Sequence, residues 1–313
     1  MNTSSRARLA VASAAVVAGT TLATGAAPAA AATVVVDCAA GATISAAIAS
    51  AQPGDTVSVS GTCRETVLVP RRLTSLTLVG QSSASIVGPP SSTPATSPAS
   101  FTVFVESTGF VLRGFTIVGG AHGVHLSGPA TATIEDNVIR ESAGAIHLDK
   151  GSVGQVLGNT LEDNDGYGIN LQEDSYARIG FRIPTLPPVG NLIRNNDGPG
   201  IIVGQRSSAW IAGNQLTRNA GDGVVVDRIS HADVIGNRIA RNGGDGIDVR
   251  NGSGLNLDPR GTALDVSGPN SGRNAGVGVR CRVGGFVAGP LGTLNGAKAR
   301  SRFTRGCVDA TTS

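Results

Sequence analysis

The feature that most constrains this chain is a short motif that recurs along its middle. Each copy has an asparagine followed by a strand-like run, as in Gly158-Asn159-Thr160-Leu161. The asparagines occur at intervals of 22, 32, 23 and 23 residues and are Asn137, Asn159, Asn191, Asn214 and Asn237. A second run of the Gly-Ile-x-Leu type follows each copy, as at 168–171. A fixed repeat of about 20–50 residues indicates a solenoid in which each copy forms one coil.

Apolar and variable residues alternate in both runs, so the apolar side chains of all coils point the same way. Stacked coils would therefore enclose one apolar interior. A second polar position comes five residues after each motif asparagine and is occupied by Ser142, Asn164, Asn196, Asn219 and Asn242. Asparagines stacked at the strand spacing of ~4.8 Å can hydrogen-bond from coil to coil. We therefore expect both asparagine columns to be structural.

The pattern Asn-x-Ile, then Asn, then Gly-Ile-x-Leu at 22–23 residues resembles the repeats of secreted parallel β-helix proteins of the pectate-lyase-like superfamily. The resemblance covers nearly the whole chain after residue 32. It implies an all-β fold, a single-stranded right-handed parallel β-helix with three strands per coil. We expect about eight to ten coils from the number of repeats. The resemblance does not specify the chemistry, because one fold hosts many functions.

Residues 1–32 have the pattern of a secretory signal peptide, with two arginines, an apolar stretch and an Ala-rich cleavage site. A membrane anchor is the alternative for this segment. Residues 33–313 are then the β-helix domain, which we divide into an N-terminal cap at 33–56, coils at 57–250 and a C-terminal closing segment at 251–313.

Two segments before the regular repeats have a composition of their own. Residues 42–51 (ATISAAIASA) place their apolar residues on one helical face, which predicts a helix that covers the open first coil. Residues 89–100 (PPSSTPATSPAS) are of low complexity and predict an exposed loop.

Charge and composition exclude several classes of partner. Removal of residues 1–32 takes away two of 25 basic residues and none of 22 acidic ones, so the mature chain is close to neutral. Aromatic residues are only 3% of the chain and do not alternate with basic ones, which argues against nucleic-acid binding. No apolar run after the signal approaches the ~20 residues that span a bilayer. We expect a secreted monomer whose partner is a polysaccharide.

The chain has four cysteines, an even number that suits an oxidising compartment. Cys38 and Cys63 flank the start of the fold, and Cys281 and Cys307 lie in its last segment. We expect these two local disulfides among the three possible connectivities. A metal site would require tighter spacing of Cys and His.

The variable position of the Gly-Ile-x-Leu runs faces outward and could carry chemistry. In coil order it is His125, His147, Asn170, Ile202, Val225 and Asp248. Two residues further on come Ser127, Asp149 and Gln172, and Lys150 follows at once. Three neighbouring coils therefore present imidazole, carboxylate, amide and ammonium groups side by side. Exposed polar residues are also expected on any solenoid face, so a solvated surface is the alternative.

Resembling enzymes bind polysaccharide along such a face, and β-elimination on a uronic acid needs a carboxylate-binding group, a base and an acid. Asn170 and Gln172 could hold the carboxylate. His147 or Lys150 could be the base, because either can titrate near neutral pH in a suitable environment. His125 could be the acid, and Asp149 could orient His147 or pair with Lys150.

A longer interval between two coils corresponds to extra residues around 175–189. Tyr176, Arg178 and Arg182 lie in this insertion, and we expect it to wall the patch and contact substrate, although a neutral insertion is equally compatible with the sequence. We expect no cofactor. Ca²⁺ is conceivable, but the patch contains only Asp149 as an acid and gives no clear calcium site, and no other metal site is expected.

A second acidic group contains Asp222, Asp245, Asp227, Asp248 and Arg250. A cation site or a glycosidase pair is one interpretation, and turn-forming aspartates with an Asp227–Arg250 ion pair are the favoured one. The function that the sequence favours is a carbohydrate-active lyase or epimerase acting on an acidic polysaccharide. The alternative is a non-catalytic β-helix that binds glycans or acts at the cell surface.

Overall fold

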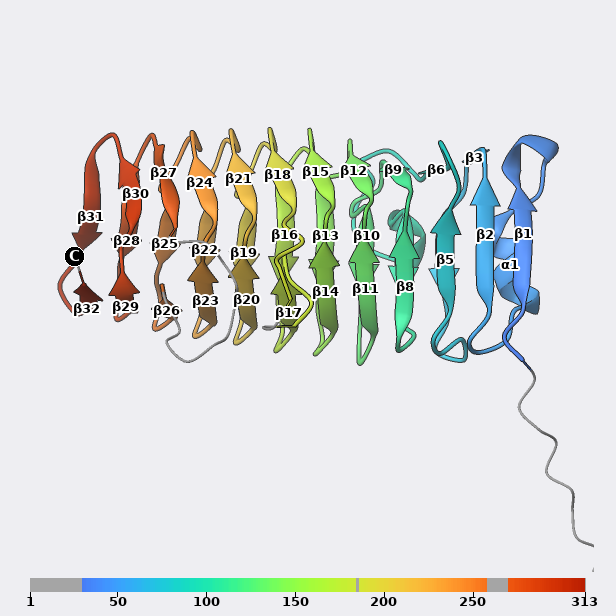
Figure 1. Cartoon of the computed structure of the whole chain (residues 1–313), viewed down its shortest axis with the longest axis horizontal. Helices are drawn as coiled ribbons and strands as arrows, with labels where there is room; N and C mark the ends of the chain where they lie inside the picture. The colour runs from blue at the N-terminus through green and yellow to red at the C-terminus, as the bar shows by residue number, and fades with distance from the viewer. Residues whose placement is uncertain (1–29, 184–185, 258–269, 313) are drawn as a thin grey trace, which may run out of the picture. The chain divides into compact units, whose positions relative to one another are not determined.

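The computed structural model describes residues 30–183, 186–257 and 270–312. The expected signal peptide therefore lies almost entirely outside the described residues. From Ala31 onward the chain forms one unit of parallel strands wound into a coil (Figure 1). The strands form three parallel sheets, here named A, B and C.

Sheet A has 12 strands and sheets B and C have 10 each. The strands of sheet A are β1 (Thr33–Asp37), β2 (Thr56–Ser60), β5 (Thr77–Gly80), β8 (Phe110–Arg113), β11 (Thr131–Glu135), β14 (Val153–Leu157), β17 (Tyr176–Ile179), β20 (Ser208–Ala212), β23 (His231–Ile235), β26 (Gly254–Asn256), β29 (Phe286–Pro290) and β32 (Val308–Thr312). Those of sheet B are β3 (Thr62–Cys63), β6 (Ser85–Val87), β9 (Thr116–Val118), β12 (Val138–Arg140), β15 (Thr160–Glu162), β18 (Leu192–Arg194), β21 (Gln215–Thr217), β24 (Arg238–Ala240), β27 (Ser271–Asn274) and β30 (Thr293–Gly296). Those of sheet C are β4 (Val67–Val69), β7 (Val103–Val105), β10 (Val124–Leu126), β13 (Gly144–Leu148), β16 (Tyr167–Leu171), β19 (Ile201–Val203), β22 (Val224–Val226), β25 (Ile247–Val249), β28 (Val277–Cys281) and β31 (Ala299–Phe303). The described helices are α1 (Ile44–Ser50) and the 3₁₀ turns η1 (Cys38–Ala40) and η2 (Pro98–Ser100).

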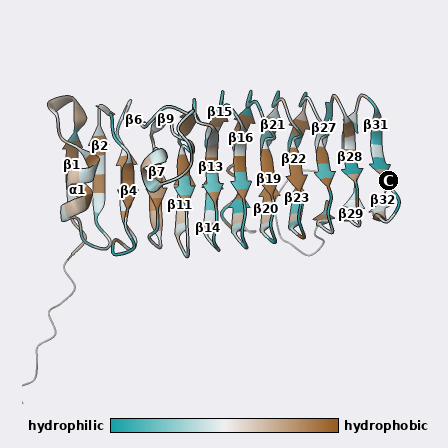
Figure 2. Ribbon diagram, turned by 180° about the vertical axis from the view of Figure 1, so that it is seen from behind, coloured by the Kyte–Doolittle hydropathy of each residue, from teal (hydrophilic) through white to brown (hydrophobic). Residues whose placement is uncertain are grey.

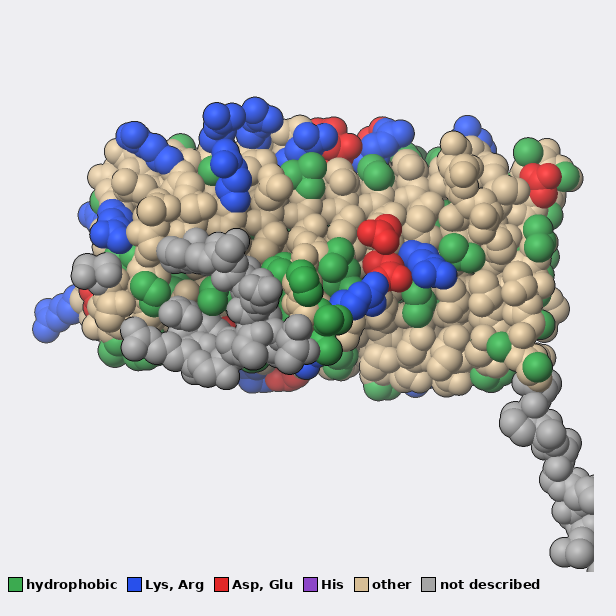
Figure 3. Space-filling model, viewed as in Figure 1, with side chains coloured by type: hydrophobic (Ala, Val, Ile, Leu, Met, Phe, Trp, Pro, Cys, Tyr) green, Lys and Arg blue, Asp and Glu red, His purple; other side chains and the backbone are tan. Residues whose placement is uncertain are grey.

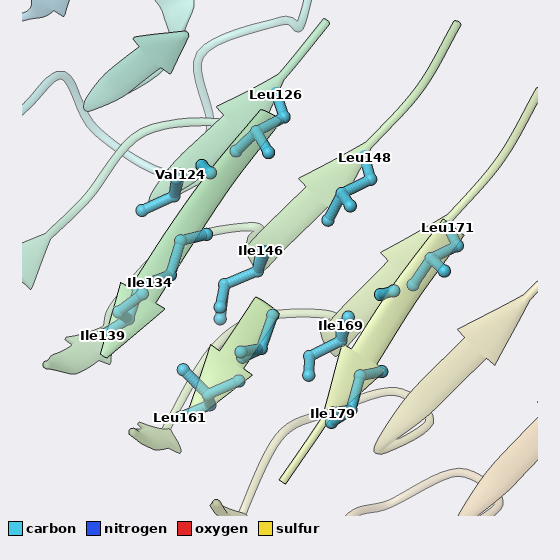
Figure 4. Packing of buried hydrophobic residues seen from close by; sticks show 14 of the residues in the cluster. Val124, Leu126, Ile134, Ile139, Ile146, Leu148, Leu161, Ile169, Leu171 and Ile179 are labelled. Carbon is cyan, nitrogen blue, oxygen red and sulfur yellow. The ribbon is translucent and has the colours of Figure 1, made fainter. Parts of the chain in front are cut away.

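The interior is built from the alternating apolar residues of the repeat. Ile146 pairs in register with Ile169, and Leu148 with Leu171, so like residues stack from coil to coil. Figure 4 shows these side chains pointing into the coil together with residues of the other sheets, such as Ile134 of sheet A. All are fully buried. Because burial of such a side chain contributes about 1.5–3 kcal/mol, the stack is the main source of stability.

Both asparagine columns form buried hydrogen-bonded ladders, as predicted. In the first, the Asn137 side chain donates to Asn159 Oδ1 at 3.1 Å, and Asn159 donates to Asn191 Oδ1 at 3.0 Å. Each Oδ1 also accepts the backbone N–H of the preceding asparagine. The ladders continue past the repeat to Asn270 and Asn274. The asparagine repeat is therefore explained by turn hydrogen bonding alone.

The helix predicted at 42–51 is present as α1 and lies beside β1 and β2 at the N-terminal end of the coil (Figure 1). The Glu65 carboxylate accepts the N–H groups of Ile44 and Ser45, at 2.7 and 2.9 Å. At the other end of α1, the Arg72 guanidinium donates to three carbonyls, those of Ile48, Ala49 and Ala51. Both ends of this short helix are thus satisfied by side chains from the first coils.

The two expected disulfides, Cys38–Cys63 and Cys281–Cys307, are both formed. The number of coils is larger than the eight to ten expected, because the 12 strands of sheet A continue through β26, β29 and β32. The repeat motif fades after residue 251, yet inward residues such as Val279 and Leu294 remain fully buried. Figure 2 shows hydrophilic colour on the last strand of sheet C, β31. This polar last coil suits an end that faces water. Among the described residues, no helix is long and apolar enough to cross a membrane.

Candidate functional site

The outward column predicted for sheet C exists in the expected register. His125 of β10 pairs with His147 of β13, and His147 pairs with Asn170 of β16. Phe104 of β7 precedes His125 in the same column. Although these side chains point away from the interior, His125, His147 and Asn170 are buried, with at most 8% of each residue exposed. The alternative of a solvated surface is therefore wrong for this part of the column.

A third histidine, which the column did not include, completes the cluster. His122 lies in the turn before β10, and its ring stacks on His147, with centroids 4.3 Å apart and planes 6° apart. Phe101 stacks on the opposite side of His122, at 4.9 Å and 2°. The rings of Phe101, His122 and His147 thus form one continuous stack that shields both imidazoles from water.

Hydrogen bonds connect the histidines to Asp149. His122 Nδ1 lies 3.0 Å from His125 Nδ1, and His125 Nε2 lies 3.1 Å from Asp149 Oδ2. The carboxylate can only accept, so we assign the Nε2 proton to His125. His125 Nδ1 must then accept from His122 Nδ1–H. The result is a relay that runs from His122 through His125 to Asp149.

Tyr167 holds the other side of His147. Its hydroxyl lies 2.9 Å from His147 Nδ1, and the Asn170 amide nitrogen lies 3.4 Å from the same atom. The tyrosine ring lies across Gly144, where an added Cβ would sit 2.8 Å from the hydroxyl oxygen and closer still to ring carbons. Glycine is therefore needed at this position so that Tyr167 can reach the histidine.

The environment shifts the pKa values of four groups in the cluster. Burial, followed by the neighbouring imidazoles, lowers the pKa of His122 to about 2. Burial and then His125 lower the pKa of His147 to about 4. Burial opposes ionisation of Asp149, but hydrogen bonds from His125 and Ser127 outweigh it and lower the pKa of Asp149 to about 2. Burial raises the pKa of Tyr167. At neutral pH His122 and His147 are therefore neutral, and Asp149 is ionised.

A recess of about 330 Å³ opens beside the cluster. It is lined by His125, Ser127, Asp149 and Lys150, and Lys150 Nζ lies 3.5 Å from Ser127 Oγ. The rest of its wall consists of residues 95–98 with Phe101, Phe104, Glu106 and Arg71. The low-complexity segment, predicted only as an exposed loop, thus provides part of the wall, together with η2.

The insertion at 175–189 does not form that wall. Its first residues form β17, so Tyr176 and Arg178 belong to sheet A, whereas the histidines lie on sheet C. Arg178 donates to the Arg182 carbonyl at 3.0 Å, and Arg182 forms an ion pair with Glu135 of β11. These three predicted contact residues therefore lie away from the cluster. Gln172, also predicted, is half-buried on the outer face of sheet C, where its Oε1 accepts from Gln205 at 3.4 Å.

The cluster also has the donor set of a transition-metal site. One ligand atom each from His125, His147 and Asp149 lie within 4.8 Å of one another. Two buried oxygens of the cluster, Asp149 Oδ1 and Asn170 Oδ1, have no hydrogen-bond partner among the described residues. Neutral imidazoles with a carboxylate suit zinc, copper, nickel or iron, and Ca²⁺ would require more oxygen ligands.

The second acidic group is structural, as favoured by the sequence. Asp227 pairs with Arg250 at 3.2 Å. Asp248 is fully buried and receives Arg250 Nη1 at 3.2 Å and Arg282 Nε at 3.0 Å. Asp245 receives Arg280 Nη2 at 3.0 Å. Asp222 accepts the backbone N–H of Asp245 at 2.6 Å, as expected for an aspartate in a turn, and the arginines neutralise the other three carboxylates.

Sequence reasoning missed His122, Tyr167, Phe101 and Phe104. Phe104 had a signal, because Val103-Phe104-Val105 is a strand run whose middle residue falls in the outward column. Tyr167 and His122 come from turns or strand starts beside the column, where the repeat does not define the side-chain direction. Their contacts depend on the shape of the coil corner, which the sequence pattern does not give.

Two family models match parts of the chain. One is described as "Right handed beta helix region" and matches residues 188–260, and the other as "Periplasmic copper-binding protein (NosD)" and matches residues 54–182. No curated protein matches the sequence.

Solved structures share the fold at low identity. A pectate lyase, Pel9A, is similar with a TM-score of 0.55 and 13% identity, over 86% of this chain and 79% of the lyase. The A-module of the Azotobacter vinelandii mannuronan C-5 epimerase AlgE6 has a TM-score of 0.47 and 19% identity, over 87% and 94% of the two chains. Pectin methylesterase from carrot has a TM-score of 0.43 and 15% identity, over 90% and 88%.

Proposed function

Since the chain has the right-handed parallel β-helix fold of the pectate-lyase-like superfamily, we propose that it is a carbohydrate-active protein, a lyase or epimerase that acts on an acidic polysaccharide. The observation that carries the proposal is the His122–His125–Asp149 relay, which borders a recess that Lys150 also lines. The similar pectate lyase acts on a uronate polymer by name, and this supports the substrate class.

The recess contains the groups that removal of a proton beside a carboxylate requires. Arg71 and Lys150 are cationic and line the recess, so they can neutralise a uronate carboxylate and thereby acidify the neighbouring C5 proton. The half-buried ring of Phe104 offers an apolar surface to a sugar ring. This contact and the cationic groups would hold the sugar in the recess.

His125 is the proposed base, in place of the acid role expected from the sequence. Asp149 holds its Nε2–H, so Nδ1 carries the lone pair, and substrate must displace the His122 hydrogen bond to reach it. His125 takes the C5 proton, the C4–O bond breaks to leave a C4–C5 double bond, and the Lys150 ammonium protonates the leaving oxygen. In an epimerase, the C4–O bond would stay intact and a water molecule would instead protonate C5 on its opposite face. His147, which does not line the recess, is a positioning residue that acts through the ring stack.

An extracytoplasmic location accompanies this proposal. Its support is the pair of disulfides and the match to a model described as periplasmic.

The test is incubation of the protein with polyuronates, following absorbance of the unsaturated product and, for epimerisation, the proton NMR spectrum of the polymer. His125→Ala should lower kcat by at least about 100-fold, as expected for loss of a general base. His231→Ala is the matched control, because His231 is exposed on sheet A. Lys150→Met has Lys298→Met as its control. Turnover unaffected by His125→Ala and Lys150→Met would place the chemistry elsewhere, and binding without product on any polymer would favour the non-catalytic module.

A second candidate function is binding of a transition metal. The match of residues 54–182 to a copper-binding family model spans all of the cluster, and the unpartnered Asp149 Oδ1 points to a missing cation or proton donor. His125, His147 and Asp149 would hold the ion. Calorimetric titration of metal-free protein with Cu²⁺, Zn²⁺ and Ni²⁺ tests this function. Binding that is abolished by His147→Ala and retained in His231→Ala would support it, and uronate turnover unaffected by a chelator would separate the two functions.

A further inference from the structure

A groove of about 590 Å³ lies on sheet B and is lined by four arginines. Arg194 lies at the end of β18, Arg218 and Arg241 follow β21 and β24, and Arg238 begins β24. Figure 3 shows basic side chains gathered along this edge of the molecule, over β21 and β24. The histidine cluster lies on sheet C, so the groove is separate from the candidate site.

Most of the positive charge in this groove is uncompensated. Arg194 pairs with Glu162, with Nη2–Oε2 at 2.6 Å and Nε–Oε2 at 2.8 Å. Arg218, Arg238 and Arg241 are exposed, and across the described ranges none of the three has a carboxylate at ion-pair distance. Arg206, by contrast, is exposed but pairs with Asp174 at 2.7 Å. Three guanidinium groups therefore face one open space without a counter-charge.

The backbone fixes where two of these arginines emerge. Arg218 and Arg241 occupy the same turn position in successive coils, with left-handed φ values of 59° and 61°. The equivalent positions of earlier coils are acidic or neutral, namely Glu141, Asp163 and Asn195, with φ values of 57°, 54° and 55°. The turn geometry is thus constant while the charge at this position changes sign along the coil. The basic residues at this turn position continue to Arg273, which precedes Asn274 of the ladder in the next coil, and are a property of the side chains chosen in these later coils.

We propose that this groove binds an anionic polysaccharide through its carboxylate or sulfate groups. Arginine binds such groups with two parallel hydrogen bonds, and stacked coils repeat the guanidinium groups at ~4.8 Å steps, which suits a polymer with a charge on each sugar. Gln215 and Thr217 add amide and hydroxyl groups that hydrogen-bond sugar hydroxyls. No aromatic side chain is among the described residues that line the groove, so it lacks a platform for stacking nucleic-acid bases.

This inference goes beyond the proposed function, because it assigns a second polymer contact that takes no part in proton transfer. Binding here would hold a long chain on the protein while another stretch of polymer occupies the recess. Long polymers should therefore depend on the groove, and short oligomers should not.

The experiment measures the affinity of polygalacturonate, its methyl ester and a single-stranded DNA by electrophoresis in gels that contain each polymer. The triple variant Arg218→Gln, Arg238→Gln and Arg241→Gln should bind polygalacturonate at least about tenfold more weakly than the native protein, since three ion pairs are lost. The methyl ester should bind weakly to both, and high salt should abolish binding of polygalacturonate.

The control variant Arg228→Gln, Arg302→Gln and Arg305→Gln removes the same charge from exposed sites elsewhere and should bind normally. His125→Ala should also bind normally, which separates failure of the catalytic proposal from failure of this one. Equal loss in both triple variants would show a non-specific charge effect and overturn the groove. DNA binding as tight as that of polygalacturonate would overturn the glycan assignment.

Discussion

Replacement of Asn196 by alanine should show how much the buried ladders contribute to the fold. Asn196 lies in the middle of the second ladder and is 1% exposed. Its amide group donates to Leu161 O at 3.1 Å and to Asn219 Oδ1 at 2.9 Å. Its Oδ1 accepts from the backbone N and the side chain of Asn164, at 3.2 and 2.8 Å. Asn196→Ala removes all four hydrogen bonds, and the methyl group of alanine forms none in their place.

The cost follows from the groups that the substitution leaves unpaired. The Asn164 side chain retains hydrogen bonds to two carbonyls, and Asn219 Oδ1 retains the backbone N–H of Asn196. The Asn164 backbone N–H and the Leu161 carbonyl lose their ladder partners inside the protein. A buried group without a partner costs about 1–3 kcal/mol, so we expect the free energy of unfolding to fall by about 2–5 kcal/mol.

Urea unfolding of the disulfide-bonded protein measures this change. Far-ultraviolet circular dichroism reports all coils, and the single tryptophan, Trp210 of β20, reports the coil that follows the substitution. Asn195→Gly is the matched control, because Asn195 is exposed, has a left-handed φ of 55° and makes no ladder contact. The control should change stability by less than about 0.5 kcal/mol. A loss below about 1 kcal/mol in Asn196→Ala would refute the ladder as a stabilising element.

Three further outcomes test the cap and the cluster. Glu65→Ala removes the carboxylate that caps α1, and chemical denaturation should show a loss of about 1–2 kcal/mol; an unchanged midpoint would contradict the capping role. Gly144→Ala forces the Tyr167 ring off its position, so its activity should fall to the level of Tyr167→Phe, and full activity in either variant would separate the tyrosine from the site. The folded-state pKa values of His122 and His147 lie below the unfolded value of 6.5, so their contribution to stability is complete above pH 6.5 and decreases as the pH falls toward 4. In metal-free protein the loss should be about 1.4 kcal/mol per pH unit for each histidine, and His122→Phe, which preserves the ring stack, should roughly halve the slope of stability against pH; an unaltered slope would contradict the assignment.

The fold could be predicted because the repeat records which residues face inward. Asn159 and Asn191 follow each other at 32 residues instead of 23, yet they bond in the same ladder, so the extra residues had to leave the coil between them. The number of coils was underestimated because the last coils lose the Asn-x-Ile motif while retaining single buried residues such as Val287. One apolar residue per strand suffices to continue a stack that has already started, and a motif search does not detect it.

The site could be predicted in part, for a related reason. The register that stacks Ile146 on Ile169 also places His147 beside Asn170, so the outward column follows from the inward one. The prediction that residues 175–189 wall the histidine cluster was wrong, because it placed them beside Gln172 on the ground that they follow it closely in sequence. One turn separates Gln172 from Tyr176, and that turn carries the chain from sheet C to sheet A. In a β-helix, a residue a few positions along the chain can lie on a different sheet, whereas the residue one repeat away lies on the same sheet.

Three polar residues in or beside the outward column show how a structural group differs from a candidate functional one. Asp248 is fully buried, and both of its oxygens are bonded to arginines, as expected for a charge that only maintains the fold. Asp149 and Asn170 are also in or beside this column, but each retains a buried oxygen without a partner in the described structure. Such oxygens are costly unless a ligand satisfies them, and native proteins have few of them. Asp149 lines the recess and Asn170 lies beside His147, so a substrate hydroxyl or a metal ion at the cluster could supply a missing partner.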